Sequence, residues 1–268
     1  MRDTARRLPA FDTRVPNVAR MYDFMLGGKD NYASDRDAVG KLVEMAPQAP
    51  LRARLNRAFL GRAVRYVADQ GVRQFLDVGA GLPTQENVHQ VAQAVAPDAR
   101  TVYVDNDPVV LSHARALLST DPHTAVAAGD VREPGGILGD PQTRALLDFT
   151  RPMCILLVAI LHFVPDSHGP AGIIAAFRDA VAPGSYLILS HATMDGAPPR
   201  EAARTGDAKA VYDKATAPLI MRGAGQVSRL LDGFSLVEPG LVHVTAWRPD
   251  APTRSGFDAF LGAVGRKD

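Results

Sequence analysis

The stretch "QFLDVGAGLPTQENVHQ", residues 74–90, decides the fold class of this chain. Its apolar start ends on Asp77, and Gly79 and Gly81 follow with one residue between them. We expect a helix to begin near Thr84, which gives the order of strand, glycine turn and helix typical of nucleotide-binding loops. The third glycine of a dinucleotide fingerprint would fall at position 84, where the chain has Thr84 behind Pro83.

Length and composition indicate a globular protein with a substantial core. The chain has 268 residues, of which 46% are hydrophobic and 22% charged, so it can form one large α/β domain with or without an appendage. Its 30 basic and 29 acidic side chains give a net charge of +1. This balance gives no reason to expect nucleic acid or an anionic membrane as a partner.

The cysteine content and the chain start bear on the expected compartment. Cys154 is the one cysteine and lies in the apolar run "MCILLVAIL", which predicts a core thiol. That run is far shorter than the roughly 20 apolar residues that cross a bilayer. The first residues, "MRDTARRLPAFDTR", lack the apolar region of a signal peptide. We therefore expect a soluble cytoplasmic protein.

Strands and helices are predicted to alternate after residue 73. Five strand-like runs are "RQFLDV", "RTVYVD", "TAVAAGD", "MCILLVAIL" and "SYLILSHA", with amphipathic stretches between most of them. Asp107 and Pro108 read as the cap and first residue of one of these helices. The alternation predicts a Rossmann-like, mostly parallel sheet.

Both ends of the chain differ from this pattern. Residues 1–72 predict a helical annex before the sheet domain of residues 73–250. The annex could act as a lid, or could only cover the sheet. "GFSLVEPGLVHVTAWRP" predicts an antiparallel hairpin joined at Pro239–Gly240, and the weakly patterned residues 251–268 predict a frayed tail.

Asp77 discriminates between the two common ligands of such a loop. NAD places a pyrophosphate on the helix N-terminus, where a neighbouring carboxylate would repel it. S-adenosylmethionine carries an α-ammonium group and a sulfonium instead, which a carboxylate attracts. Asp77 and the missing third glycine therefore favour S-adenosylmethionine, held near Asp77, Gly79, Ala80 and Gly81.

Acidic residues after the next two strands extend the expected site. Asp105 ends the second strand and could accept hydrogen bonds from both ribose hydroxyls, with Asn106 beside it. Alternatively, these residues could only start a helix. Asp130 follows the third strand and could accept from an adenine amino group, while Val131 offers its backbone N–H; a plain turn aspartate is the alternative.

Several stretches together resemble a known family. "FLDVGAG", "VYVDND" and "GDV" are similar to the first three motifs of class I S-adenosylmethionine-dependent methyltransferases. "ARMYDFMLGGKDNYASDRDA", "NRAFLGRAVRY", "LHFVPD" and "PGLVHVTAWRPD" resemble, more narrowly, a family of small methyltransferases long filed as a domain of unknown function. The resemblance implies a seven-stranded sheet with a terminal hairpin. It also implies cofactor contacts at Gly79, Gly81, Asp105 and Asp130, but no substrate.

One departure from the usual loop affects the cofactor's carboxylate. Leu82 and Pro83 stand where a third glycine often follows, and proline has no N–H to donate. The carboxylate could then depend on donors outside the loop, such as Arg57 or Lys29. We expect Arg57→Ala to weaken cofactor binding.

The segment "MLGGKDNY" has two interpretations. A hinge at Gly27–Gly28 would let Tyr22, Lys29, Asn31 and Tyr32 close over the cofactor and substrate. Alternatively, Gly27 caps a helix and a surface turn follows. A Walker phosphate loop is excluded because Asp30 follows Lys29 where Ser or Thr is required.

Methyl transfer needs no catalytic triad, and the sequence offers only isolated candidates. His162 and His191 follow or end the last two parallel strands and could accept a proton, although lone histidines are more often structural. No metal site is expected. The sequence thus predicts an S-adenosylmethionine-dependent methyltransferase acting on a small molecule. The alternatives are a binding module without catalysis and, less favoured, a NAD-dependent oxidoreductase. The oligomeric state is not determined by these patterns.

Overall fold

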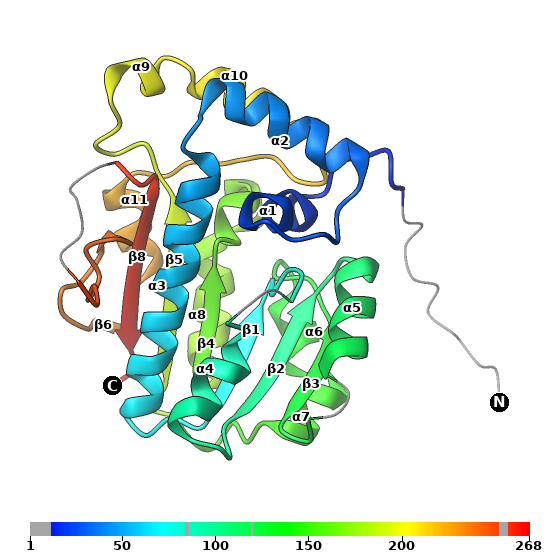
Figure 1. Cartoon of the computed structure of the whole chain (residues 1–268). Helices are drawn as coiled ribbons and strands as arrows, with labels where there is room; N and C mark the ends of the chain where they lie inside the picture. Colours follow the sequence, from blue (N-terminus) through cyan, green and yellow to red (C-terminus); the bar gives the residue numbers. More distant parts are fainter. Residues whose placement is uncertain (1–11, 84–85, 119–120, 252–256) are drawn as a thin grey trace.

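A mostly parallel sheet of eight strands forms the centre of the computed structural model, which describes residues 12–83, 86–118, 121–251 and 257–268 (Figure 1). The strand order is β3-β2-β1-β4-β5-β8-β6, with β7 also paired to β8. The parallel strands are β1 (Gln74–Val78), β2 (Arg100–Asp105), β3 (Thr124–Ala128), β4 (Cys154–Val158) and β5 (Tyr186–Ala192). The antiparallel strands are β6 (Ser235–Leu236), β7 (Val242–His243) and β8 (Phe260–Arg266). The predicted Rossmann-like, mostly parallel fold class is confirmed, with eight strands in the described part of the chain instead of the implied seven.

Helices cover both faces of the sheet, because alternate side chains of each buried strand point to opposite sides. Phe75 packs with α3 (Ala49–Asp69), α4 (Val88–Val95) and α5 (Pro108–Leu118) on one face. Leu76 packs on the other face. The helices of that second face are α6 (Pro134–Leu138), α7 (Pro141–Leu146), α8 (Pro170–Ala180) and α11 (Ala224–Leu230).

A cap of helices lies over the carboxyl ends of the parallel strands (Figure 1). It consists of α1 (Val18–Leu26), α2 (Ala33–Met45), α9 (Pro199–Ala202) and α10 (Thr205–Tyr212). Met21, Leu42 and Tyr212 of this cap form a third apolar cluster with Ala192, the last residue of β5. Two short 3₁₀ helices, η1 (Leu161–Phe163) and η2 (Asp166–His168), follow β4. Since ligands of parallel sheets bind at this end, the cap roofs the expected site.

Local sequence signals correctly predicted the positions of most of these helices and strands. Asp107 caps α5 as predicted, accepting hydrogen bonds from the N–H groups of Val109 at 2.7 Å and Val110 at 3.3 Å. The helix after the glycine loop is present but begins at Val88. Its expected start at Thr84 lies outside the described residues.

The prediction of a frayed C-terminal tail is wrong for residues 260–266. They form β8, which pairs along its length with β5. The pattern was weak because glycines stand where neighbouring helices and loops press on the strand: a Cβ added at Gly262 would lie 2.9 Å from Phe59 Cζ, and one at Gly265 2.8 Å from Phe234 Cβ.

The predicted hairpin at Pro239–Gly240 is also wrong in its pairing. β6 pairs with the end of β8, and β7 pairs with its beginning, so the two short strands follow one another along the same edge. The turn is present, with Gly240 N–H donating to Val237 O at 2.8 Å. The two segments on either side of this turn do form strands, but each pairs with β8, the last strand of the chain, instead of with the other.

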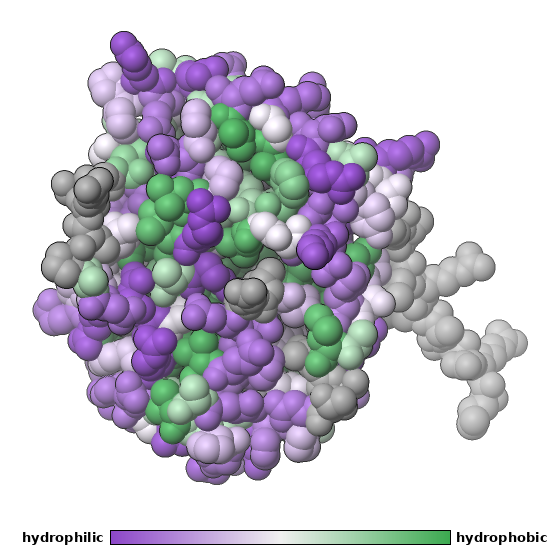
Figure 2. All heavy atoms as spheres, viewed as in Figure 1, coloured by the Kyte–Doolittle hydropathy of each residue, from purple (hydrophilic) through white to green (hydrophobic). Residues whose placement is uncertain are grey.

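The surface in the orientation of Figure 1 is mainly hydrophilic, with hydrophobic side chains in small separate patches (Figure 2). Within the described residues, no helix has the length and apolar character needed to cross a membrane.

Candidate active site

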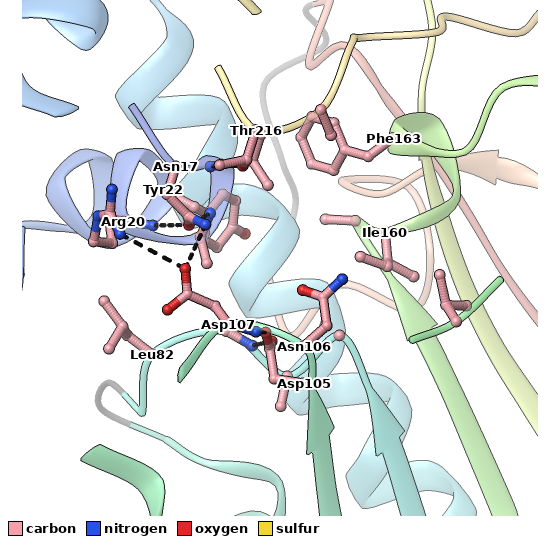
Figure 3. A pocket seen from close by; sticks show the side chains of 18 of the residues that line it. Asn17, Arg20, Tyr22, Leu82, Asp105, Asn106, Asp107, Ile160, Phe163 and Thr216 are labelled. Carbon is pink, nitrogen blue, oxygen red and sulfur yellow. Dashed lines mark hydrogen bonds and ion pairs between the residues drawn. The ribbon is translucent and has the colours of Figure 1, made fainter. Parts of the chain in front are cut away.

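A cavity of about 650 Å³ lies at the carboxyl ends of β1, β2 and β4, beneath α1 (Figure 3). We call it the donor cavity. The predicted residues that line it are Tyr22, Arg57, Asp77, Gly79, Ala80, Gly81, Asp105, Asn106, Asp130 and Val131. The other five predicted residues, all within the described ranges, do not line it: Lys29, Asn31, Tyr32, His162 and His191. The residues chosen around the glycine loop are thus brought together.

Gly79 and Gly81 shape the loop that forms the floor of the donor cavity. Both adopt the left-handed conformation, with φ of 73° and 66°, which costs a residue with a Cβ more than it costs glycine. A Cβ at Gly79 would also lie 2.6 Å from the Ile160 side chain, which lines the cavity from the loop after β4. The absence of a side chain therefore lets Ile160 pack closely against the glycine loop.

Asp77 is a buried carboxylate that makes no hydrogen bond to another described residue. Burial raises its pKa to about 7, with the positive charge of Arg57 acting in the opposite direction and Asp105 adding to the rise. A buried carboxylate without hydrogen-bond donors is poorly stabilised in its ionised form. A cationic group in the cavity would stabilise it.

Asp105 already holds the glycine loop. One carboxylate oxygen accepts from Gly81 N–H and the other from Asp107 N–H, each at 2.9 Å. Burial raises the pKa of Asp105 to about 6 despite these donors. Each carboxylate oxygen can accept more than one hydrogen bond, so Asp105 can also accept from ligand hydroxyls.

The carboxylate of Asp130, predicted to accept from an adenine amino group, already accepts several hydrogen bonds within the protein. Arg132 binds it through its backbone N–H, its Nε and a very short contact from Nη2. Asn106 Nδ2 donates to it at 3.2 Å. Hydrogen bonds from Arg132 lower the pKa of Asp130 to about 2. Both Asp130 and the neighbouring Val131 line the donor cavity.

The wall formed by α3 contains one residue that the sequence did not single out. Asn56 is buried, lines the donor cavity and donates from Nδ2 to the Tyr22 hydroxyl at 3.0 Å. That hydroxyl in turn donates to Ala53 O at 3.0 Å. Asn56 Oδ1 is buried and has no hydrogen-bond partner within the described residues, so it is an unsatisfied acceptor in this wall. Next to it, Arg57 donates to Glu86 O at 3.1 Å.

Sequence reasoning also missed the residues that hold α1 over the cavity. Asn17 Nδ2 donates to Asp107 Oδ2 at 2.6 Å, and Arg20 Nη1 lies 3.6 Å from the same oxygen (Figure 3). Arg20 Nε pairs with Asp35 at 2.8 Å, and both side chains are almost completely buried. We call Asn17, Arg20, Asp35 and Asp107 the latch. Asn17, Asp35 and Asp107 each have a local role at a helix start, but the contacts that join the latch connect distant segments.

The segment after α1 forms a fixed turn in this structure. Gly27 caps α1 with φ of 87°, as the second interpretation predicted. Asp23 then accepts hydrogen bonds from Asp30 N–H at 3.1 Å and Asn31 Nδ2 at 2.9 Å. Lys29 is exposed. Tyr32, also exposed, lies against the Arg20 guanidinium at the start of α2.

His162 and His191 lie behind the donor cavity rather than in its lining. His162 Nδ1 accepts from Ala192 N–H at 3.3 Å, and burial holds the pKa of His162 well below its usual value. His191 donates from Nδ1 to Ala192 O at 2.8 Å, and its Nε2 accepts from Arg222 at 2.9 Å. Burial lowers the pKa of His191 to about 4. Their role as bases stays a prediction that these hydrogen bonds do not favour.

Solved structures with the same fold include methyltransferases, one of them in complex with S-adenosyl-L-homocysteine. A provisionally assigned methyltransferase from Thermobifida fusca YX is 40% identical with a TM-score of 0.89, over 98% of this chain and 99% of that one. A DUF574 family protein from Streptomyces avermitilis MA-4680 is also 40% identical, with a TM-score of 0.90, over 96% and 99% of the two chains. The N-methyltransferase NodS from Bradyrhizobium japonicum WM9, in complex with S-adenosyl-L-homocysteine, is 15% identical with a TM-score of 0.50, over 80% and 87%. No curated protein matches the sequence.

The sheet, the glycine loop and these relatives define a class I methyltransferase that uses S-adenosylmethionine as its methyl donor. More narrowly, the chain belongs to the S-adenosyl methyltransferase family, which it matches over residues 4–268. The donor cavity fits this cofactor, since it places beside the glycine loop a buried carboxylate, Asp77, that makes no hydrogen bond to another described residue.

Proposed function

We propose that this chain methylates a small-molecule acceptor and that the donor cavity holds S-adenosylmethionine. The observation that carries the proposal is the latch, in which Asn17 and Arg20 join α1 to Asp107 at the start of α5 and so hold α1 over the donor cavity. While these contacts hold, α1 covers the methyl group, so an acceptor must fit beneath α1 in the closed state, which a small molecule can do. The net charge of +1 also gives no support to a nucleic-acid substrate.

The lining supports a specific placement of the donor's polar groups. Asp77 would face the α-ammonium group, because its pKa is raised and it makes no hydrogen bond to another described residue. Asn56 Oδ1 would accept a second hydrogen bond from that ammonium. Asp105 would accept from the ribose hydroxyls, and Val131 and Asp130 line the place expected for adenine. Asp130 would have to share its oxygens with Arg132.

Arg57 is the better of the two proposed partners for the donor's carboxylate. It lines the donor cavity from α3, whereas Lys29 is exposed and lies outside it. Its contact with Glu86 O, at 3.1 Å, places the guanidinium at the start of the segment before α4. A guanidinium can bind a carboxylate through two parallel hydrogen bonds.

The chain's own contribution to the reaction is positioning and exclusion of water. S-adenosylmethionine supplies an electrophilic methyl group on a sulfonium. Burial beneath α1 keeps water from that group, and the fixed Tyr22 and Asn56 hold one wall of the cavity in place. Alignment of two reactants can account for much of a displacement's acceleration, so no general base among these residues is needed. We propose that α1 and α2 act as the lid, with opening required for exchange of donor and product.

Donor binding is tested by calorimetry with S-adenosylmethionine, S-adenosylhomocysteine and NAD on the wild type and Asp105→Ala. We expect S-adenosylmethionine and S-adenosylhomocysteine to bind to the wild type and NAD not to bind. Asp105→Ala should bind both sulfur compounds more weakly, while its cooperative unfolding shows that it is still folded. Binding of NAD alone would refute the placement.

The acceptor class is tested with S-adenosylmethionine carrying a labelled methyl group and a cell extract separated by ultrafiltration. We expect label in small-molecule products of the ultrafiltrate, together with S-adenosylhomocysteine. Label in protein or RNA would contradict a small-molecule acceptor. Tight donor binding with no product from either fraction would favour the binding module over the enzyme.

A further inference from the structure

A second cavity, of about 120 Å³, lies beside the donor cavity between the helical cap and the end of β5. Val18, Tyr22 and Phe163 line both cavities and so form the wall between them. Figure 3 shows Tyr22 and Phe163 entering the view from α1 and from the turn after β4. A molecule in the second cavity would therefore lie next to whatever the donor cavity holds.

The size and lining of the second cavity suit one planar apolar ring. A cavity of roughly 150 Å³ lined by apolar side chains accepts a benzene molecule in a well-studied protein. Four methionines, Met25, Met45, Met194 and Met221, contribute to the lining together with Phe260. Methionine sulfurs make favourable contacts with aromatic rings and adapt to their shape. The lining is thus typical of an aromatic ligand rather than a sugar or a chain of polar groups.

His162 offers this cavity a hydrogen-bond donor. It lines the cavity, and its Nδ1 accepts from Ala192 N–H at 3.3 Å, so the hydrogen of the neutral ring is on Nε2. Nε2 makes no hydrogen bond to another described residue. In this tautomer His162 can donate to an oxygen of a ligand, but Nε2 has no lone pair with which to remove a proton.

Positive charge predominates among the charged residues of the same lining, which are Arg52, Glu201 and Arg204. Arg52 Nη2 donates to Glu201 at 2.5 Å, while its buried Nε has no hydrogen-bond partner among the described residues. The Arg204 side chain makes no hydrogen bond or ion pair within the described ranges. Arg52 Nη1 also makes no hydrogen bond to a described residue and, unlike Nε, is not fully buried, so a ligand oxygen in the cavity can accept from it. An anionic group matches the excess positive charge.

We propose that the second cavity is the acceptor pocket and that it takes a one-ring aromatic carboxylate, with the carboxylate toward Arg52 and the ring among the methionines. This assignment rests on the proposed methyl transfer. A nucleophilic ring substituent at the wall of Tyr22 and Phe163 would form a bond to the methyl carbon with a lone pair. The electron pair of the breaking carbon–sulfur bond stays on sulfur, and the substituent's proton passes to solvent. His162 acts here as a positioning residue, by donating to a ligand oxygen.

Binding of three one-ring probes tests the ligand class. Benzoate, benzamide and benzylamine share the ring and differ in charge, and each is titrated by calorimetry into the protein saturated with S-adenosylhomocysteine. We expect benzoate to bind more tightly than benzamide by about tenfold, a factor typical of one good polar contact, and benzylamine not to bind. Equal or tighter binding of benzamide or benzylamine would overturn the carboxylate assignment. Competition between benzoate and S-adenosylhomocysteine would place benzoate in the donor cavity instead and would overturn the pocket.

Two variants with matched controls locate the probe. Ala208 lines the cavity from α10, so Ala208→Leu should fill it, whereas Ala210→Leu changes an exposed position of the same helix. Arg52→Gln removes the unpartnered donor, and Arg54→Gln alters an exposed arginine of the same helix.

We expect Ala208→Leu and Arg52→Gln each to weaken benzoate at least about tenfold, with S-adenosylhomocysteine affinity unchanged. Unchanged benzoate binding in both, or no benzoate binding to the wild type, would overturn the acceptor pocket. Because S-adenosylhomocysteine is measured in the same samples, this failure is distinguishable from failure of the proposed methyltransferase.

Discussion

The Asp77 carboxylate should couple donor binding to pH. Burial raises its pKa to about 7 from an ordinary 3.8. Each factor of ten in proton affinity corresponds to about 1.4 kcal/mol, so the ionised carboxylate is about 4 kcal/mol less stable in the fold than in water. Because the folded-state pKa is raised, the associated stability is present below about pH 4 and is lost as pH rises through about 7. A cationic ligand reverses this loss by stabilising the ionised form.

The magnitude for binding follows from the fraction of Asp77 that is ionised. With a pKa of about 7, about one molecule in 100 is ionised at about pH 5 and nine in ten at about pH 8. If the bound donor requires the carboxylate, its affinity should rise by about 100-fold across this range. In Asp77→Asn the affinity should be lower at about pH 8, and most of the pH dependence should disappear. Above about pH 7 the same variant without ligand should be more stable than the wild type.

Calorimetry over this pH range, in buffers of different ionisation enthalpy, measures both the affinity and the protons released. The expected result near pH 6 is release of close to one proton by the wild type and markedly fewer by Asp77→Asn. Asp105, whose pKa burial raises to about 6, is present in both proteins, so the difference between them reports on Asp77. Identical pH profiles for the two proteins would refute the pairing of Asp77 with the donor's cation.

Three further substitutions test the loop, the wall and the latch. Gly79→Ala should abolish donor binding, because its Cβ would lie 2.6 Å from Ile160 at a φ of 73°; calorimetry checks this, and wild-type affinity would contradict the close fit. Arg57→Ala should lower the affinity for S-adenosylmethionine about tenfold or more, with Arg54→Ala as the control on the same helix. Equal affinities of Arg57→Ala and the wild type would show that Arg57 does not bind the donor. Arg20→Met should lower the free energy of unfolding by about 3–5 kcal/mol, since it leaves Asp35 buried without its ion pair; a melting temperature like that of the wild type in thermal unfolding would show that the latch is not stabilising.

Local patterns were sufficient for the parallel strands and for the donor side of the site. Asp77 and Asp105 lie at the ends of β1 and β2, and Gly81 lies in the loop after β1; the pattern of apolar residues locates such ends. Parallel strands bring their carboxyl ends to one edge of the sheet, so residues chosen from separate strands were bound to meet. The order of apolar run, glycine turn and helix was therefore informative before any contact was known.

The last strand and the latch were decided only by tertiary structure. β8 has little strand pattern of its own, because Gly262 makes room for Phe59 from a helix about 200 residues earlier in the chain. Arg20 meets Asp107 across 87 positions of sequence, and neither residue's neighbours indicate a partner. Such contacts depend on how the cap folds back over the sheet, which no local period records.

The donor cavity and the second cavity differ, for the same reason, in how far the sequence predicts them. The sequence by itself determined the fold class and the donor, because the loop after β1 combines backbone conformation and charge within a few residues. The second cavity takes its lining from α1, α2, α3, α10, the end of β5 and the start of β8. Its shape exists only after these distant segments pack together, so the chemistry of the acceptor could be argued from tertiary structure alone.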